Sequence, residues 1–336
     1  MSLSAGRAAS LRSRTPPPPS GGPMRVRARL AFSSLLGFAL AAPASAAGQE
    51  GTVLRYRFEP GQTFTYVTTT ETETTQTMMG SEQTSRQTLV QGVRMEVLSV
   101  DGDGAARLSY TTESVRVTME GPMGTLTWDS AVPDAPVPPP LQAFAGMHGG
   151  TYFLIMEPTG GVRGVEGTED LVERMVQRMT LPPGMSPEAL KADLRAQFGD
   201  ESMTAAMSQN LGAFPAEGLA VGSSWTRTGR TPGFPILLET TATVVGREGG
   251  VVTLATTSTM TSDSASVLEV SQMVQRFDLA GGGTGTMEIE EATGMLVRMR
   301  TEMTMEGEMT MSMGSQELTI PMSSRSVTTQ ERQAGD

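Results

Sequence analysis

Apolar and polar residues alternate with a period of two along two long parts of the chain, one ending near residue 130 and one beginning near residue 225. Alternation of this kind is typical of β-strands that bury one face and expose the other. In the first part, Leu54–Phe58 and the threonine-rich run Phe64–Met78 predict strands, and a return strand extends towards Val100. Threonine is β-branched and fits a pleated strand. We therefore expect a series of antiparallel strands before residue 130.

Clusters of glycine, aspartate and proline predict where the strands turn. Asp101–Gly104 (DGDG) is typical of a hairpin turn, and Ala105–Glu120 continues as the next strand. Pro158–Gly160 separates two short apolar runs in the same manner. In the last part of the chain, Gly281–Gly283 is expected to be another turn. The chain is thus predicted to double back repeatedly as hairpins.

The centre of the chain carries a helical period instead. Apolar residues between Glu169 and Met179 form one stripe, with Thr168 as the predicted N-cap. Ser186 and Pro187 mark the start of a second helix, because proline is favoured at the first helical position. A third helix is predicted near Ser202–Leu211. These helices separate the two β-rich parts.

The clearest alternation lies between residues 287 and 313, where the apolar residues are almost all odd-numbered and the even positions hold mostly charged residues. The apolar set is Met287, Ile289, Met295, Val297, Met299, Met303, Met305, Met309, Met311 and Met313. This pattern predicts one buried and one solvated strand face. A continuous strand of ~19 residues would be unusually long, so we expect a bend or a break near Gly307.

These patterns predict a mainly β (α+β) fold: a large curved antiparallel sheet or half-barrel, with two to three central helices packed on one face. We expect a single β-rich domain over residues 47–336, with a helical insertion at about 168–212. Hydrophobic residues make up only 38% of the chain and aromatic residues 5%. The regular apolar period nevertheless favours a packed domain over a disordered chain.

Residues 24–46 have the three parts of an export signal in the right order. Arg25–Arg29 is basic, Leu30–Leu40 is apolar, and small residues follow, with cleavage expected near Ala46. The apolar run is too short for a membrane-spanning helix, which needs ~20 residues. We interpret residues 1–23 as an extension from a mis-assigned start codon. The mature protein is therefore expected to be periplasmic or extracellular, with no transmembrane helix.

The charge and the absence of cysteine exclude several classes of function. The net charge is −11, and residues 1–46 hold six of the 25 basic residues and none of the 36 acidic ones. The remainder is strongly acidic, which disfavours nucleic-acid binding because phosphate backbones are repelled. Without cysteine the chain has no thiol nucleophile, disulfide, thiolate metal site or lipid-modified N-terminal cysteine.

The sequence has no recognisable catalytic or metal-binding motif. His148 is the single histidine and Lys191 the single lysine, and neither lies in a recognisable catalytic motif. Ala280–Gly285 is glycine-rich but precedes a predicted strand, unlike a phosphate-binding loop. A calcium loop starting at Asp101 would need glycine where the chain has Ala106. We therefore predict no catalytic residue, no metal site, no cofactor and no enzyme.

A set of short, mainly turn-forming motifs lies between residues 128 and 296: Trp128-Asp129-Ser130, Glu157–Val162, Val165-Glu166-Gly167, Val221–Trp225, Gly283–Thr286 and Thr293–Leu296. Together they resemble an uncharacterised family of exported bacterial proteins, known only as a domain of unknown function. That resemblance implies no activity and no catalytic residues. Many members look like lipoproteins, and this chain departs from them by lacking the cysteine.

The order of strands, central helices and strands also resembles the half-barrel of lipid and lipoprotein carriers of the bacterial envelope. In that architecture a curved antiparallel sheet cups helices or an acyl chain. The resemblance is at the level of the fold, and it implies an apolar ligand for this chain only by analogy.

The 25 methionines are the sharpest chemical feature of the sequence. Methionine serves as pliable core filler, and it also lines adaptable ligand faces. Thioethers spaced by two residues lie on one strand face, where they also resemble the clusters that hold Cu(I). The sequence leaves these three interpretations open.

The leading hypothesis is a non-enzymatic exported envelope protein that binds or carries an apolar ligand such as a lipid. The candidate ligand-binding residues are Met295, Val297, Met299, Met303, Met305, Met309, Met311 and Trp225. One alternative is a structural or protein-interaction module without a small-molecule site, whose partner would be another envelope protein. The other is a methionine-rich Cu(I)-binding protein.

Overall fold

The computed structural model describes residues 51–78, 80–122, 124–181, 186–210, 213–230, 236–262, 267–270, 273–313 and 316–334. The chain divides into two compact units, residues 1–47 and 48–336. The predicted extension, the predicted signal peptide and the cleavage site near Ala46 lie outside the described residues. Everything below concerns the second unit.

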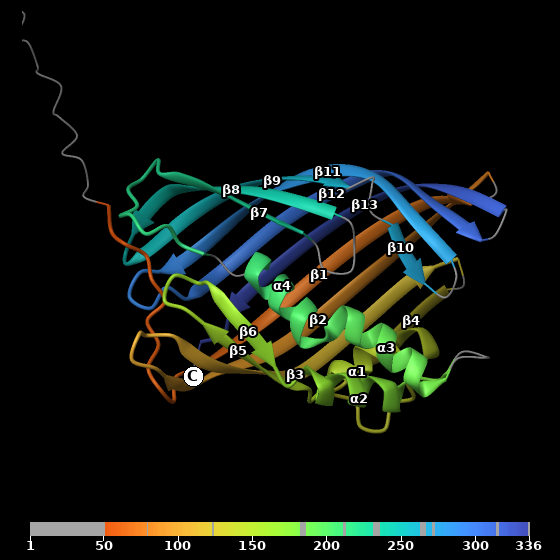
Figure 1. Cartoon of the computed structure of the whole chain (residues 1–336), viewed down its shortest axis with the longest axis horizontal. Coiled ribbons are helices and arrows are strands. Elements are labelled where there is room, and N and C mark those ends of the chain that lie inside the picture. The colour runs from red at the N-terminus through yellow and green to blue at the C-terminus, as the bar shows by residue number, and fades with distance from the viewer. Residues whose placement is uncertain are drawn as a thin grey trace, which may run out of the picture. The chain divides into compact units, whose positions relative to one another are not determined.

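The described strands form one antiparallel sheet of 13 strands, in the order β6-β5-β3-β2-β1-β13-β12-β11-β9-β8-β7, with β4 beside β3 and β10 beside β11. Their bounds are β1 Thr63–Met78, β2 Ser81–Val100, β3 Ala106–Gly121, β4 Gly124–Asp129, β5 Thr151–Met156, β6 Val162–Glu166, β7 Ser224–Arg230, β8 Ile236–Glu248, β9 Val251–Ser262, β10 Val267–Val270, β11 Met273–Glu290, β12 Leu296–Met313 and β13 Gln316–Arg332. The sheet is long and curved, as Figure 1 shows. The predicted fold class is confirmed.

The helices lie together on one face of the sheet (Figure 1). They are a 3-10 turn, Pro139–Leu141, and helices α1 Gln142–Met147, α2 Thr168–Arg178, α3 Pro187–Phe198 and α4 Asp200–Asn210. Helix α1 contacts β3 and α2 contacts β5, whereas α4 contacts both β6 and β7. Since β6 and β7 end the two sides of the sheet path, α4 joins the two edges of the curved sheet.

We call the face that carries the helices the inner face. Its largest buried cluster includes Tyr66, Leu254 and Ile289 from the strands, and Met203 and Met207 of α4 pack against it. This cluster occupies one end of the sheet. Its burial supplies the main apolar stabilisation of that end, at about 25 cal/mol for each Å² of apolar surface removed from water.

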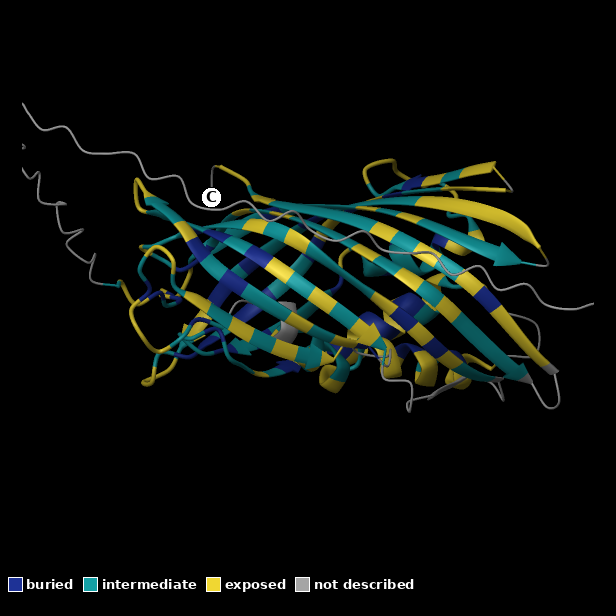
Figure 2. Cartoon of the chain, turned by 90° about the horizontal axis from the view of Figure 1, so that it is seen from above, coloured by how far each residue is buried: buried dark blue, intermediate teal, exposed yellow. Residues whose placement is uncertain are grey.

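The opposite, outer face is charged and solvated. Arg86 and Glu73 lie 2.6 Å apart across β2 and β1, and Arg298 lies 2.6 Å from Glu288 across β12 and β11. Figure 2 shows exposed positions alternating with less exposed ones along these strands. Such exposed ion pairs each contribute at most about 1 kcal/mol, so the outer face mainly supplies solubility.

Leu54–Phe58 does not form the predicted strand. The segment crosses one end of the sheet, where the Tyr56 amide donates to Pro158 O at 2.8 Å and the following amide donates to Thr293 O at 2.9 Å. The ring of Tyr56 stacks on Phe214 with centroids 5.1 Å apart. The alternation in this segment therefore arises from side chains inserted into the end of the sheet, not from pairing within it.

The predicted turn at Gly281–Gly283 is also wrong, because these residues lie inside β11 and pair with both β9 and β12. A Cβ atom at Gly282 would lie 2.5 Å from Ser258 O, and one at Gly285 would lie 2.7 Å from Thr301 Cγ2. Side chains larger than hydrogen do not fit here. The glycine run thus lets three strands approach closely where the sheet coils, which is a known role of glycine within strands.

The expected bend in β12 is present, whereas the predicted N-cap of α2 is wrong. Strand β12 is 18 residues long and pairs with β13 without interruption from Arg298 to Met313. Gly307 adopts a φ of 145° within this stretch, so the strand bends there and does not break. At the start of α2 the N-cap is Gly167, with a φ of 82°, and not Thr168. The Thr168 hydroxyl instead donates to Asp200 Oδ1 at 2.6 Å and ties α2 to α4.

Candidate functional site

The sequence-predicted ligand residues of β12 lie on the inner face of the sheet. Met299 pairs with Met287, which packs against the largest buried cluster, and this places the odd-numbered residues from Met299 onward on the same face. Met295 is buried in that cluster at 5% exposure. The other candidates on β12 are only half-buried: Val297, Met299, Met303, Met305, Met309 and Met311. The methionine face is therefore not a filled core.

Part of this face forms a separate apolar patch, which we call the methionine cluster. It consists of Ile236, Met260, Phe277, Leu279, Met305, Met309 and Met322. All of these residues belong to strands β8, β9, β11, β12 and β13, so no described helix residue takes part in it. The helices pack elsewhere on the inner face, and the four methionines of this cluster remain partly exposed.

A band of hydroxyl side chains on β1 and β13 starts between the largest buried cluster and the methionine cluster and extends to Ser324, which pairs with Met305. Thr70 Oγ1 and Thr328 Oγ1 lie 3.3 Å apart across β1 and β13, and Thr72 Oγ1 lies 3.3 Å from Ser326 Oγ. Thr74 and Ser324 repeat this pairing at the next inner-face position. Because a hydroxyl both donates and accepts, each pair shares one hydrogen bond and keeps a further donor, so the band stays polar.

Trp225 and Arg227 extend the inner face to the edge strand β7. They are two residues apart and both half-buried, while their neighbours Ser224, Thr226 and Thr228 are exposed. Trp225 packs against the largest buried cluster, and its Nε1 is buried without a hydrogen-bond partner among the described residues. Burial lowers the pKa of Arg227, because removal from water disfavours the charged guanidinium, and the Tyr56 phenol acts in the opposite direction.

Tyrosines line the inner face near the same end. Tyr110 and Tyr152 stack with centroids 5.5 Å apart, and the hydroxyl of Tyr66 donates to Leu296 O at 3.3 Å. Burial raises the pKa of all three phenols above the ordinary value of 10.0. They therefore stay neutral at physiological pH and offer hydroxyl groups to this part of the inner face.

The two residues considered for catalysis do not belong to the methionine cluster. His148 stands edge-on to Trp128, with ring centroids 6.5 Å apart. Lys191 lies 2.5 Å from Glu169 and 2.6 Å from Glu173, on the surface shared by α2 and α3. In the described part of the chain, no three His, Asp or Glu side chains are grouped so as to hold a metal ion.

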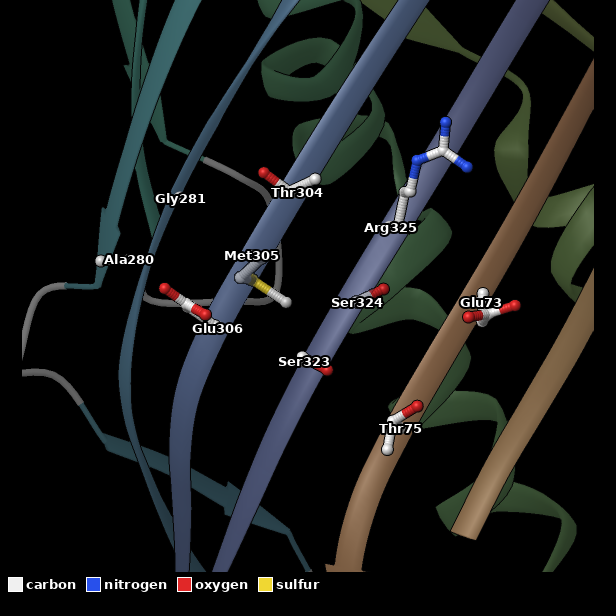
Figure 3. A pocket seen from close by; sticks show the side chains of 10 residues that line it. All are labelled: Glu73, Thr75, Ala280, Gly281, Thr304, Met305, Glu306, Ser323, Ser324 and Arg325. Carbon is white, nitrogen blue, oxygen red and sulfur yellow. The ribbon is translucent and has the colours of Figure 1, made fainter. Parts of the chain in front are cut away.

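A pocket of about 410 Å³ lies beside the bend in β12. Figure 3 shows the side chains that line it. Glu73, Thr75, Ser323, Arg325 and Glu306 line it, and each of these alternates along its strand with an inner-face residue. This cavity therefore belongs mainly to the charged outer face. Its carboxylates and guanidinium make it a poor place for an apolar molecule.

Sequence reasoning missed Arg227 and the hydroxyl band. An arginine that alternates with threonines, as in Thr226-Arg227-Thr228, has the pattern of a solvated strand face. Only the pairing of β7 with β8 and the packing of Trp225 place Arg227 inside. The signal available in the sequence was the neighbouring Trp225, which shares its face at a spacing of two.

Comparison with protein families finds one match: the model described as "Family of unknown function (DUF6263)" matches residues 103–296. That range contains all of the motifs that carried the resemblance seen in the sequence, and the predicted relationship to an uncharacterised family is confirmed. No curated protein matches the chain. In the described part of the chain, no helix has both the length and the apolar character needed to cross a membrane.

Among solved structures, a chain from "Lipid-protein interactions in lipovitellin" is 9% identical with a TM-score of 0.44, and the match covers 83% of this chain and 26% of that one. The chain thus spans about a quarter of the length of that structure. OccK5 (OpdH) of Pseudomonas aeruginosa is 7% identical with a TM-score of 0.21, covering 81% and 98% of the two chains. The COG4313 outer membrane channel of Pseudomonas putida F1 is 7% identical with a TM-score of 0.19, covering 83% and 97%. These likenesses concern strand arrangement alone.

Proposed function

We propose that this chain, which belongs to the family of unknown function DUF6263, is a non-enzymatic exported protein that binds an apolar ligand on the inner face of its sheet. The observation that carries the proposal is the methionine cluster. It gathers seven large apolar side chains on the inner face, with no described helix residue packed among them.

The inner face carries apolar surface that the described side chains leave partly exposed. Met305 and Met309 stay half-buried although they lie on the face that elsewhere forms the core. Covering such surface with an acyl chain gains about 25 cal/mol for each Å² removed from water. Methionine suits this role because its unbranched thioether adapts to guests of different shape.

The proposal that the protein is not an enzyme is supported by the side chains that could act in catalysis. The chain has no cysteine, and its single lysine is held between two carboxylates of α2. Several carboxylates of the outer face lie in ion pairs, such as Glu302 with Arg325 at 2.7 Å. None of these groups stands beside the methionine cluster in an arrangement for proton transfer or nucleophilic attack.

We also propose that the protein acts outside the cytoplasm. Residues 24–46 carry the export signal, and the strongly acidic remainder suits a protein that stays dissolved outside the cytoplasm. An apolar ligand in such a compartment needs shielding from water. A curved sheet with an apolar patch on its inner face and charges on its outer face supplies that shielding.

The experiment exposes delipidated protein to palmitic acid and to a phospholipid and detects complexes by native mass spectrometry. Met305→Asp is expected to reduce uptake at least about tenfold, because it places a charge against the ligand. Thr304→Asp is the matched control, since Thr304 is exposed on the outer face and should leave uptake unchanged. Absence of any uptake by the unaltered protein would instead favour a structural or protein-interaction module.

A further inference from the structure

The inner face carries no charge where the methionine cluster meets the hydroxyl band. Five neighbouring strands, β2, β1, β13, β12 and β11, form this part of the sheet. Their register places every charged residue of the following stretches on the outer face: Thr68–Gln76, Gln83–Gln91, Gln275–Met287, Met299–Met311 and Leu318–Gln330. The inner positions of these stretches hold apolar residues, glycine, serine, threonine and glutamine. A ligand that lies across these strands therefore contacts an uncharged surface.

Apolar and hydrogen-bonding side chains lie directly side by side on this surface. Ser324 of the hydroxyl band is the cross-strand partner of Met305, and it lies two residues from Met322 on the same face of β13. Directly paired residues have Cβ atoms about 5 Å apart. Ser324 also pairs with Thr74 on its other side, where the two hydroxyl oxygens lie 3.3 Å apart. The hydroxyl band therefore borders the methionine cluster, and one amphiphile can contact both.

The hydroxyl band supplies hydrogen-bond donors and acceptors without charge. Two paired hydroxyls share one hydrogen bond, which leaves one O–H group and further lone pairs for another partner. The pair Thr72 and Ser326 and the pair Thr74 and Ser324 stay half-buried, so these groups are within reach of a ligand. An ester carbonyl accepts from such an O–H group, and a ligand hydroxyl both donates and accepts. A pure hydrocarbon would leave these groups without a partner, which is costly.

An anionic headgroup finds no counterion on this surface. Transfer of a carboxylate or a phosphate out of water is costly unless a cation compensates it. Along β13, the first inner-face arginine is Arg332, eight residues from Ser324 or about 26 Å at ~3.3 Å per residue, and it is ion-paired with Glu290 at 3.1 Å. Arg227 belongs to the edge strand β7, five strands from β13 in the sheet order. The surface beside Ser324 therefore favours an uncharged polar group.

Apolar surface extends from the hydroxyl band far enough for an acyl chain. Met311 lies six residues beyond Met305 on the same face of β12, about 20 Å at ~3.3 Å per residue. An acyl chain in one leaflet of a bilayer spans about 15 Å, half of the ~30 Å hydrocarbon core. Leu318, the cross-strand partner of Met311, is 41% exposed although it belongs to the inner face. The apolar surface is thus long enough for the chain, and its far part is only partly covered by the described residues.

We propose that the ligand is an uncharged acylglycerol, whose glycerol and ester oxygens bind the hydroxyl band at Thr74 and Ser324 and whose acyl chain follows β12 from Met305 towards Met311. This inference rests on the proposed function and names its ligand class. The residues that hold the headgroup and the start of the acyl chain lie on the adjacent strands β1, β13 and β12, so a single molecule spans the site. Neutral oxygens satisfy the hydroxyl band, and no charge has to leave water.

The first test measures equilibrium binding of radiolabelled 1-monopalmitoylglycerol, palmitate and 1-palmitoylglycerol 3-phosphate, each below its critical micelle concentration and at mildly alkaline pH. The three ligands share one acyl chain and differ in charge. The unaltered protein is expected to bind 1-monopalmitoylglycerol at least about tenfold more tightly than either anion. A smaller preference, or tighter binding of an anion, overturns the uncharged ligand class while the proposed function stands. No binding of any of the three overturns the proposed function itself.

The second test places a cation in the hydroxyl band. Ser324→Lys is expected to reverse the preference, so that palmitate and 1-palmitoylglycerol 3-phosphate bind at least as tightly as 1-monopalmitoylglycerol. Ser323→Lys is the matched control, because Ser323 is exposed on the outer face of the same strand and should leave the order of affinities unchanged. An unaltered order in Ser324→Lys, or the same reversal in Ser323→Lys, overturns the position of the headgroup.

The third test removes one hydroxyl pair. Thr74→Val together with Ser324→Ala should weaken binding of 1-monopalmitoylglycerol at least about fivefold and change palmitate binding less than about twofold, because the palmitate carboxylate stays in water in both proteins. Thr310→Val together with Thr319→Val is the matched control, since these hydroxyls lie 3.3 Å apart on the outer face of β12 and β13. Equal weakening of both lipids, or of neither, overturns the contact with the hydroxyl band.

The path of the acyl chain is tested by its length. Leu318→Asp is expected to weaken binding of 1-monopalmitoylglycerol at least about fivefold and to leave 1-monooctanoylglycerol unchanged, because the shorter chain ends before Leu318. Leu237→Asp is the matched control, since Leu237 is 40% exposed on the outer face of β8 and should change neither affinity. Equal effects of Leu318→Asp on the two ligands, or no effect on either, overturn the proposed path.

Discussion

Gly281 of β11 lies directly opposite Met305 of β12, and a Cβ atom on Gly281 would meet the backbone of Thr304 and Met305. The same glycine pairs with Met260 on its other side. The absence of a side chain at Gly281 therefore lets two members of the methionine cluster approach each other across β11. The glycine run shapes the candidate site as well as the curvature of the sheet.

The first prediction concerns this glycine. Gly281→Ala is expected to lower the free energy of unfolding by about 1–3 kcal/mol, because the added methyl must displace backbone atoms of β12. Denaturant unfolding measures the change. Gly164→Ala is the control, since no atom lies within 4 Å of its would-be Cβ, and it should change stability by less than about 0.5 kcal/mol. Equal effects of the two substitutions would contradict the close approach at Gly281.

The second prediction concerns the end of the sheet that holds the largest buried cluster. Phe214 is 5% exposed and stacks on Tyr56, which inserts from the segment before β1. Phe214→Ala is expected to cost about 3–5 kcal/mol of unfolding free energy, because it leaves a cavity among buried aromatic rings. Phe214→Leu keeps most of the apolar volume and should cost less than half as much. Similar losses in thermal unfolding for both variants would show that the stack does not anchor this end.

The third prediction tests the link between α2 and α4. Thr168 is buried, with 2% of its surface exposed. Its hydroxyl donates to Asp200 Oδ1 at 2.6 Å. Thr168→Val removes the donor at nearly constant volume and should cost about 1.5–3 kcal/mol, the range for hydrogen bonds to charged groups. Thr168→Ser keeps the hydroxyl and should cost clearly less. Hydrogen exchange in α2 would then rise in the valine variant and remain low in the serine variant.

The fourth prediction is a pH dependence on the surface of α2 and α3. Hydrogen bonds from Arg195, and then from Lys191, lower the pKa of Glu169 to about 2 from its ordinary value of 4.5. Because the folded pKa is below the unfolded one, this contribution to stability is present above pH 4.5 and is lost as the pH falls from about 4.5 to about 2. Carbon-13 NMR titration of Glu169 measures the pKa directly. Arg195→Met should return it towards 4.5.

The fifth prediction separates a hydrophobic role of the methionines from copper binding. Met305→Leu and Met309→Leu in one protein keep the apolar surface and remove two thioethers, so binding of an apolar ligand should change by less than about threefold. In equilibrium dialysis under reducing conditions, the unaltered protein is expected to retain no Cu(I) beyond a protein-free control. Retention that disappears in the double variant would reverse this interpretation and support a Cu(I) site.

Much of the strand pattern could be predicted because period-two alternation is a local property. Phe64–Met78, the turn at Asp101–Gly104 and the helix start at Ser186 all appear in the structure close to where the sequence placed them. The errors have a common cause. Leu54–Phe58 alternates without pairing, and Gly281–Gly283 pairs despite its composition, because both depend on neighbours distant in the chain.

Some features of the candidate site could likewise be predicted from the sequence, and others depend on the tertiary structure. The odd-numbered methionines of β12 were recognisable because side chains at a spacing of two share a strand face. That this face stays half-buried, with no described helix residue in the methionine cluster, depends on where α4 and α1 pack. Arg227 could not be placed at all from sequence, since its threonine neighbours are typical of a solvated strand.

The sequence by itself determined the mainly β class, the central helices, the position of most turns and the two-faced character of β12. It did so because hydrophobic period and turn chemistry act over a few residues. Only the tertiary structure decided the strand order that aligns Arg227 with Thr240, Ser258 and their partners in one row. Register between strands far apart in the chain is set by the packing of the whole inner face, and the predicted ligand site depends on that register.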